Sequence, residues 1–240
     1  MLSLLFSLAL AQDYPAAEDL LIQMDENLQY DTRSSVTTME VVDARRTRSY
    51  KIISYGRGQD DAAMEYVEPE REKGTKMLKL GDELWLYMPR AERTQKISGH
   101  MMRQGMMGSD MSYEDMMGAA EFAEMYDAEV TGESTHEGRA CWVVEATATD
   151  DSVTYPRRVF LIDKEWRIPL KQELFALSGM LLKTWHMSEP VQLEGQWMPS
   201  RMEIVDELKQ GSKTVIVIED VQLGVELEDE VFSRRWLERS

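Results

Sequence analysis

The sequence contains a single cysteine, Cys141, so no disulfide within the chain is available to stabilise the fold. This residue lies in an apolar strand-like pattern, and we expect a buried thiol. Long hydrophobic runs are also missing, because no stretch reaches the ~20 apolar residues that a membrane-spanning helix needs. Positive charge is scarce, with 27 Lys and Arg against 44 Asp and Glu, and the net charge of -17 excludes nucleic acid as a plausible partner.

Recognisable catalytic motifs are missing as well. The three histidines, His100, His136 and His186, are scattered along the sequence, and none has a metal-ligand spacing such as H-E-x-x-H. The chain has no G-x-S-x-G motif, no phosphate-binding loop and no dinucleotide fingerprint. We therefore predict that the protein is not an enzyme and uses no cofactor, and a lipid-modifying enzyme with an unrecognised site ranks last among the alternatives.

The first residues have the pattern of an export signal. An apolar run ends in the small residues Ala9 and Ala11, which predicts a signal peptide over residues 1–11 and cleavage before Gln12. The run contains no Lys or Arg, which departs from the usual signal sequence. We expect residues 12–240 to form a single β domain that is soluble in the periplasm.

Charge is unevenly distributed along the chain. Residues 45–103 contain 13 Lys and Arg against 9 Asp and Glu, so this region is positive within a strongly acidic protein. It is either a surface that meets an anionic group or an ordinary solvated face whose charges keep the protein soluble.

The hydrophobic pattern changes from a helical to a strand period near residue 35. After Pro15, apolar residues at 20, 21, 24 and 28 predict one amphipathic helix. About a dozen short runs with a period of two follow, separated by turn residues, and they predict a large antiparallel sheet. These runs cover residues 35–42, 46–55, 61–67, 75–80, 83–88, 93–97, 127–133, 139–148, 157–162, 169–175, 180–188, 200–207 and 213–223.

Several predicted strands are apolar on both faces, as residues 158–162 and 182–187 show. Such a sheet needs cover on both sides, and few helices are available to provide it. Either a ligand or a movable lid fills the deficit, or the sheet closes around an ordinary packed core.

Methionine is the most unusual component of the chain. Eight of the 18 methionines lie between Met101 and Met125, and Ser112 to Asp115 resemble a capping box that starts a helix. Methionine is unbranched and polarizable, so a Met-rich surface adapts to apolar partners such as acyl chains. The alternatives are plain gap-filling side chains in a helix packed on the sheet, and a Cu(I) site, because thioethers select Cu(I).

Three segments together resemble the LolA-like family of outer-membrane lipoprotein-sorting proteins. They are Pro69–Thr75 (PEREKGT), Gly81–Arg90 (GDELWLYMPR) and Met106–Asp115, which contains MMGSD and YED. The resemblance implies a mainly β fold, a single unclosed antiparallel barrel of about 11 strands with a few helices as lid. It also implies a periplasmic carrier or chaperone for lipid or lipoprotein acyl chains, with an RND-type or ABC lipid exporter of the inner membrane as its partner. The second-ranked function is a Met-rich periplasmic Cu(I)-binding protein.

The resemblance also assigns candidate ligand-binding residues. One strand, Leu84, Trp85, Leu86 and Tyr87, lines the cavity on one of its two faces, while Arg90 and Arg93 contact the lid or an anionic headgroup. Residues 101–122 form a loop and lid with few fixed contacts. The candidate residues of this lid are Met101, Met102, Met106, Met107, Met111, Met116, Met117 and Phe122.

Overall fold

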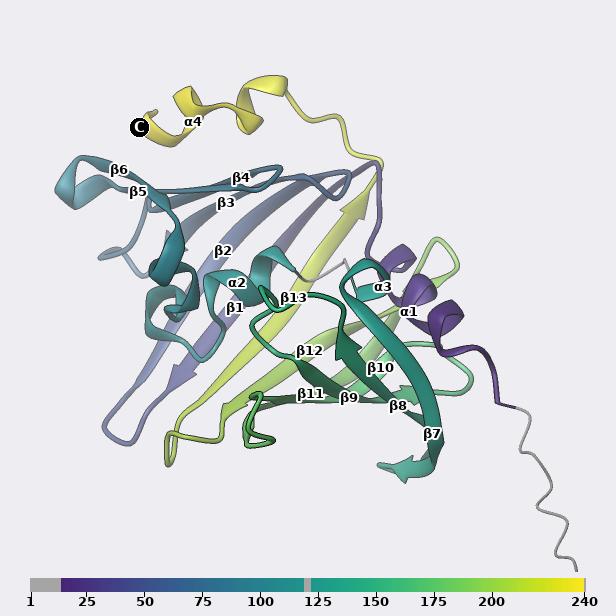
Figure 1. The fold of residues 1–240 in the computed structure, drawn as a ribbon. Coiled ribbons are helices and arrows are strands. Elements are labelled where there is room, and N and C mark those ends of the chain that lie inside the picture. Colours follow the sequence, from purple (N-terminus) through teal and green to yellow (C-terminus); the bar gives the residue numbers. More distant parts are fainter. Residues whose placement is uncertain (1–13, 119–121, 240) are drawn as a thin grey trace, which may run out of the picture.

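The computed structural model describes residues 14–118 and 122–239. The predicted signal peptide, residues 1–11, lies outside these described residues. Thirteen strands form one antiparallel sheet in the order β6-β5-β4-β3-β2-β1-β13-β12-β11-β10-β9-β8-β7. The two end strands, β6 and β7, do not pair with each other, so the sheet curves into a barrel that stays unclosed (Figure 1). This confirms the predicted fold class.

Each strand corresponds to one of the period-two runs in the sequence. The first six are β1 (Thr32–Val42), β2 (Thr47–Arg57), β3 (Asp61–Glu68), β4 (Lys76–Leu80), β5 (Glu83–Met88) and β6 (Arg93–Ile97). The other seven are β7 (Tyr126–His136), β8 (Arg139–Ala148), β9 (Arg157–Asp163), β10 (Pro169–Phe175), β11 (Leu181–Leu193), β12 (Gln196–Asp206) and β13 (Lys213–Leu223). The barrel therefore has two strands more than the resemblance implied.

The sheet consists of two meanders joined at one seam. Strands β1 to β6 pair in sequence order, and so do β7 to β13. The seam is the antiparallel pair of β1 and β13, in which Met39 lies opposite Ile216. Buried Met39, Val41 and Ile216 all belong to one apolar cluster on the concave side, so the seam runs through the core.

Helix α1 (Ala17–Glu26) covers one end of the concave face. Its Leu20, Leu21 and Met24 are almost fully buried and pack with Val144 and Phe160 of β8 and β9. The helical spacing of these side chains places all three on one stripe, which confirms the helix predicted after Pro15.

The C-terminal segment covers the opposite, convex face of the other meander. It contains a short 3-10 helix, η4 (Asp229–Phe232), and helix α4 (Arg234–Glu238), which lie over this part of the sheet (Figure 1). Their side chains of Phe232, Trp236 and Leu237 pack on Ala63 and Leu78. Strands β3 to β5 are therefore buried on both sides, which explains why they are apolar on both faces.

Residues 98–125, which we call the Met-rich connection, link β6 and β7, the two edge strands of the sheet. The described parts contain η2 (Gly99–Arg103), η3 (Met106–Gly108), α2 (Tyr113–Met117) and α3 (Phe122–Met125), and η1 (Pro89–Ala91) precedes them in the β5–β6 turn. These described parts lie over the open side of the curved sheet, between β6 and β7 (Figure 1). The capping box is confirmed, since the Ser112 hydroxyl accepts from the Asp115 N–H at 3.1 Å and the Asp115 carboxylate accepts from the Ser112 N–H at 2.7 Å.

Candidate functional site

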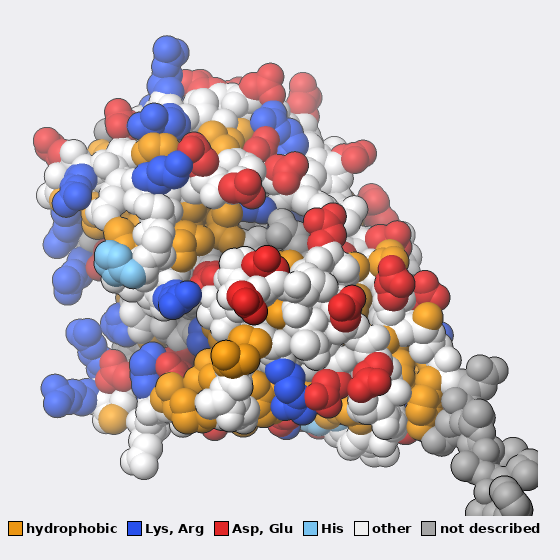
Figure 2. All heavy atoms as spheres, in the orientation of Figure 1, with side chains coloured by type: hydrophobic (Ala, Val, Ile, Leu, Met, Phe, Trp, Pro, Cys, Tyr) orange, Lys and Arg blue, Asp and Glu red, His pale blue; other side chains and the backbone are white. Residues whose placement is uncertain are grey.

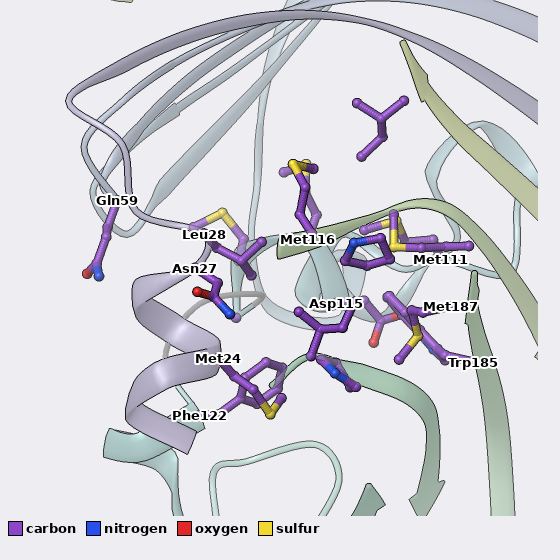
Figure 3. Close-up of a pocket in the computed structure, with 18 of the residues that line it drawn as sticks. Met24, Asn27, Leu28, Gln59, Met111, Asp115, Met116, Phe122, Trp185 and Met187 are labelled. Atoms are coloured by element: carbon purple, nitrogen blue, oxygen red, sulfur yellow. The ribbon is translucent and has the colours of Figure 1, made fainter. Parts of the chain in front are cut away.

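A cavity of about 310 Å³ lies between the concave sheet, α1 and the Met-rich connection. Figure 3 shows side chains from all three converging on it, among them Met24, Met116 and Trp185. Its volume is at the lower end of the range of small-molecule sites, about 300–1,000 Å³. A second cavity of about 160 Å³ adjoins it, because Arg33 and Met64 line both.

Methionine is the commonest side chain in the wall of the larger cavity. Three of these methionines come from the Met-rich connection and the others from α1 and the inner faces of three strands, β3, β11 and β12. The full set is Met24, Met64, Met111, Met116, Met117, Met187, Met198 and Met202. A wall of unbranched thioethers adjusts its shape to a flexible apolar ligand at little energetic cost.

Four of the predicted ligand-binding residues line this cavity: Met111, Met116, Met117 and Phe122. The other candidates in the connection, Met101, Met102, Met106 and Met107, pack on an apolar cluster beside the cavity. That cluster fills the half of the barrel formed by β1 to β6. All the candidate methionines of the predicted lid thus pack on this cluster, and only Met111, Met116 and Met117 also face the cavity.

The strand from Leu84 to Tyr87 shows which face points inward. Leu84 and Leu86 belong to the concave cluster, whereas Trp85 and Tyr87 lie on the convex face beneath the C-terminal segment. The guanidinium of Arg234 lies 4.0 Å from the Trp85 ring centre. None of the four strand residues lines either cavity.

Arg90 and Arg93 are exposed at the β5–β6 turn. Neither side chain lines a cavity, and neither is in an ion pair within the described part of the chain. The structure therefore offers no contact of these arginines with the Met-rich connection, and their predicted role stays a prediction.

Polar contacts attach the described part of the Met-rich connection to the sheet at three main places, where the sequence predicted few fixed contacts. The first is at its tightest turn, where Arg48 of β2 donates to the carbonyls of Met107 at 2.8 Å and Gly108 at 3.1 Å. Met107 has a φ of 50°, a left-handed conformation that non-glycine residues rarely adopt, and it turns this carbonyl towards the arginine. A Cβ at Gly108 would lie only 3.1 Å from Nη1 of Arg48, so the close approach depends on glycine.

The second attachment is the side chain of Asp110, which is buried. Its carboxylate accepts from the hydroxyls of Ser212 at 2.7 Å and Thr214 at 3.0 Å, next to and within β13. The Thr214 hydroxyl in turn accepts from the Asp110 N–H at 2.8 Å. The MMGSD motif thus fixes the connection to the strand at the seam.

The third attachment is an ion pair between Asp115 of α2 and Lys183 of β11, with 2.5 Å between Oδ2 and Nζ. Only 1% of the Asp115 side chain and 12% of the Lys183 side chain are exposed. The hydroxyl of Tyr155 donates to the other carboxylate oxygen at 2.8 Å. Burial raises the pKa of Tyr155, and the Asp115 charge raises it further, so this hydroxyl stays protonated and remains a donor.

Helix α3 is held by the carboxylate of Asp25 from α1. The two oxygens accept from the backbone N–H groups of Phe122 at 3.0 Å and Ala123 at 2.8 Å. Burial raises the pKa of Asp25, and these two backbone donors only partly offset that effect. The contact fixes Phe122 at the cavity wall.

Three cations line the larger cavity: Arg33, Lys79 and Arg158. Arg158 is buried, donates to the Tyr126 hydroxyl at 2.7 Å and to Gln172 at 3.3 Å, and lies about 5 Å from three aromatic ring centres, one of them Phe122. Burial lowers the pKa of Arg33. The lining carboxylates of Asp61 and Asp115 are already paired with Arg57 and Lys183.

Figure 2 shows how charge is distributed around the cavity. Apolar side chains gather in the hollow, Lys and Arg lie mainly on its left and acidic residues mainly on its right and upper margins (Figure 2). The protein has a net charge of -17, yet its cavity wall has an excess of unpaired positive charge.

The sequence did not predict most of the strand residues that line the larger cavity. Met64, Met187, Met198 and Met202 come from three different strands, and only the fold brings them together. Two of them had a usable signal, because residues 198 and 202 are an even number apart and therefore share one face of β12.

Two further kinds of site are absent from the described residues. No group of three or more His, Cys, Asp and Glu side chains there is arranged to hold a metal ion. His136 and His186, scattered in sequence, do stack with ring centres 6.2 Å apart. No helix in residues 14–118 and 122–239 is long and apolar enough to cross a membrane.

Comparison with known proteins supports the same architecture. A DUF1329 family protein from Desulfovibrio piger superposes with a TM-score of 0.85 at 24% identity, over 92% of this chain and 97% of that one. A putative outer membrane lipoprotein-sorting protein domain from Vibrio parahaemolyticus gives a TM-score of 0.81 at 24% identity, over 93% and 100%. A LolA superfamily protein from Nitrosomonas europaea gives 0.76 at 22% identity, over 93% and 100%.

No curated protein matches the sequence. A family model with the description "Uncharacterized protein" matches residues 58–239, which is most of the chain and includes the Met-rich connection, the seam strand β13 and the C-terminal segment. The chain therefore belongs to this protein family, and its fold is that of the LolA-like lipoprotein-sorting proteins.

Proposed function

We propose that this protein is a periplasmic carrier or acceptor that holds acyl chains of lipids or lipoproteins in the Met-lined cavity. The observation that carries the proposal is the cavity itself. Its wall contains eight methionines, whose unbranched side chains can adjust to ligands of different shape. The lipoprotein-sorting neighbours have the same fold, and this supports the assignment by analogy.

The energetics of acyl transfer agree with this function. Each buried methylene contributes about 0.8 kcal/mol, so a chain of about 15 methylenes leaves roughly 12 kcal/mol of hydrophobic free energy exposed in water. Such a chain does not cross an aqueous compartment alone. A carrier must provide comparable apolar cover and still release the chain.

The Met-rich connection provides apolar cover for the chain and a way to release it. It crosses the opening between the two edge strands, and besides its apolar packing it is tied to the sheet by polar contacts that involve Arg48 of β2 and its own Asp110 and Asp115. Polar contacts have discrete partners and break without disturbing the apolar sheet. Opening this connection then exposes the cavity, and a modest difference in free energy between the closed and open states controls release.

Binding of a fluorescent fatty-acid probe tests the proposal. We expect the exchange of Met116 and Met117 for Ser to weaken binding about 10-fold or more, because both side chains lose buried carbon and sulfur. Exchange of Met101 and Met102 for Ser is the matched control, since these residues lie in the same connection but do not line the cavity.

Copper binding gives the contrary outcome. Replacement of Met111, Met116 and Met117 by Leu removes sulfur but keeps apolar bulk, so we expect these variants to retain the acyl probe. Tight stoichiometric Cu(I) binding that disappears in the Leu variants, without any probe binding to the original protein, would refute the carrier function. Mass spectrometry of organic extracts from protein purified out of its native compartment identifies the cargo directly.

A further inference from the structure

The inner face of β1 changes character along its length. Met39 and Val41 point into the apolar cluster under the Met-rich connection, and the next residues on the same face are Thr37, Ser35 and Arg33. These three polar residues line the smaller cavity, which adjoins the larger, Met-lined cavity and shares Arg33 and Met64 with it. One strand thus carries an apolar section followed by a polar section that borders both cavities.

Strand β2 repeats the change beside it. Its inward residues Tyr50 and Ile52 are buried in the apolar cluster, whereas Ser54 lines the smaller cavity and lies opposite Ser35. The hydroxyls of Ser35, Thr37 and Ser54 make no hydrogen bond to protein within the described part of the chain. Three free hydroxyls therefore face the same space as Arg33.

Arg33 is a half-buried cation that has no carboxylate partner. Among residues 14–118 and 122–239, no ion pair or side-chain hydrogen bond involves its guanidinium, whose five N–H donors are left unused. Burying such a group without a partner is costly, which agrees with the lowered pKa. Arg158, by contrast, already has a hydroxyl, an amide and three aromatic rings as neighbours.

Gly56 makes room for this arginine. It lies opposite Arg33 in the β1–β2 pair, and a Cβ at this position would come within 2.7 Å of Arg33 Nε. The side chain therefore extends across the glycine along the cavity wall. Any larger residue at position 56 would displace the guanidinium.

From these observations we infer that Arg33, together with the hydroxyls of Ser35, Thr37 and Ser54, binds the anionic head of an amphiphile whose acyl tail occupies the Met-lined cavity. The inference rests on the proposed carrier function and specifies its ligand as one with a carboxylate or phosphate head. Guanidinium and hydroxyl donors match such oxygen-rich groups, and the charge-assisted bonds are stronger than neutral ones.

Competition binding with dodecanoic acid, 1-dodecanol and inorganic phosphate tests the site, using an uncharged fluorescent probe to report on the cavity. We expect the acid to bind about 10- to 100-fold more tightly than the alcohol of equal length. Phosphate alone should not compete at matched concentrations, because it lacks the tail. Phosphate binding as tight as that of the acid would instead identify a site for a free anion and overturn the inference.

Variants assign the preference to the proposed residues. Arg33→Met should remove the preference for the acid over the alcohol, and Gly56→Ala should reduce the preference although every charge is kept. Arg46→Met, at an exposed turn, is the control for net charge and should keep the preference. Loss of the preference in Arg158→Met but not in Arg33→Met would place the head elsewhere.

Outcomes for the unmodified protein separate the two proposals without any variant. Equal binding of acid and alcohol would overturn the anionic subsite and leave the carrier function intact. Binding of neither would overturn both.

Discussion

Lys183→Met removes the cation that holds α2 against β11. The Lys183 Nζ lies 2.5 Å from Asp115 Oδ2, and both side chains are largely buried. Loss of one partner from a buried ion pair typically costs about 3–5 kcal/mol, because the remaining charge is left without compensation. Asp115 keeps the Tyr155 hydroxyl and the Ser112 N–H as donors, so we expect a value near the lower limit, about 3 kcal/mol.

This loss should act locally on the Met-rich connection rather than on the sheet. Hydrogen exchange of residues 112–117 should become about 100-fold faster, while the amides of β9 and β13 keep their protection. If the connection closes the cavity over an acyl chain, as proposed, the variant should also release a bound acyl probe faster. Lys213→Met is the matched control, since Lys213 pairs with Glu203 at a more exposed position and should cost less than about 1 kcal/mol.

A double-mutant cycle with Asp115→Asn measures the coupling directly. If the pair acts as described, the two single changes are not additive, because either one alone already breaks the contact. Additive effects, or unchanged exchange of residues 112–117 in Lys183→Met, would refute the conclusion that this ion pair holds the connection closed.

Two further predictions concern stability. Burial opposes ionisation of Asp163, but Arg139 and two backbone N–H groups outweigh it and lower its pKa below 3.8, so its stabilisation is present above pH 3.8 and is lost as pH falls through the lowered value. Asp163→Asn should therefore lower the free energy of unfolding in urea by about 2–3 kcal/mol near pH 7. It should also make the loss of stability at acid pH smaller, and a loss as large as that of the original protein would contradict this. Trp236→Ala should cost about 3 kcal/mol and increase binding of a hydrophobic dye, because it uncovers the convex face of β3 to β5; equal dye binding would show that the C-terminal segment remains in place.

The strands were predictable because their hydrophobic period and turn residues are local properties. Each of the runs in the sequence became one strand, although several ends were set too early or too late. The largest error is at β11, which continues through Pro190 to Leu193. Proline is unusual within a strand because it has no backbone N–H to donate to the neighbouring strand. Here Pro190 lies opposite Pro199 of β12, so the two missing donors fall at the same place in the ladder and the pairing continues beyond it.

The orientation of the candidate strand at residues 84–87 was not predictable from its own sequence. Alternation identifies the buried face only when the other face is polar, and here Trp85 and Tyr87 are covered by the C-terminal segment more than 140 residues later. The capping box was predictable because its four residues are consecutive. Arg33 and Gly56 were not, since their relation depends on the strand register.

The seam between β1 and β13 also determines when the chain is able to fold. Residues 32–42 pair with residues 213–223, so the concave core is incomplete until almost the entire polypeptide is present. Contacts between segments so distant in sequence form slowly, because a long loop must close before they contribute any stability. A nascent chain therefore cannot complete its concave core while its C-terminal strand is still missing.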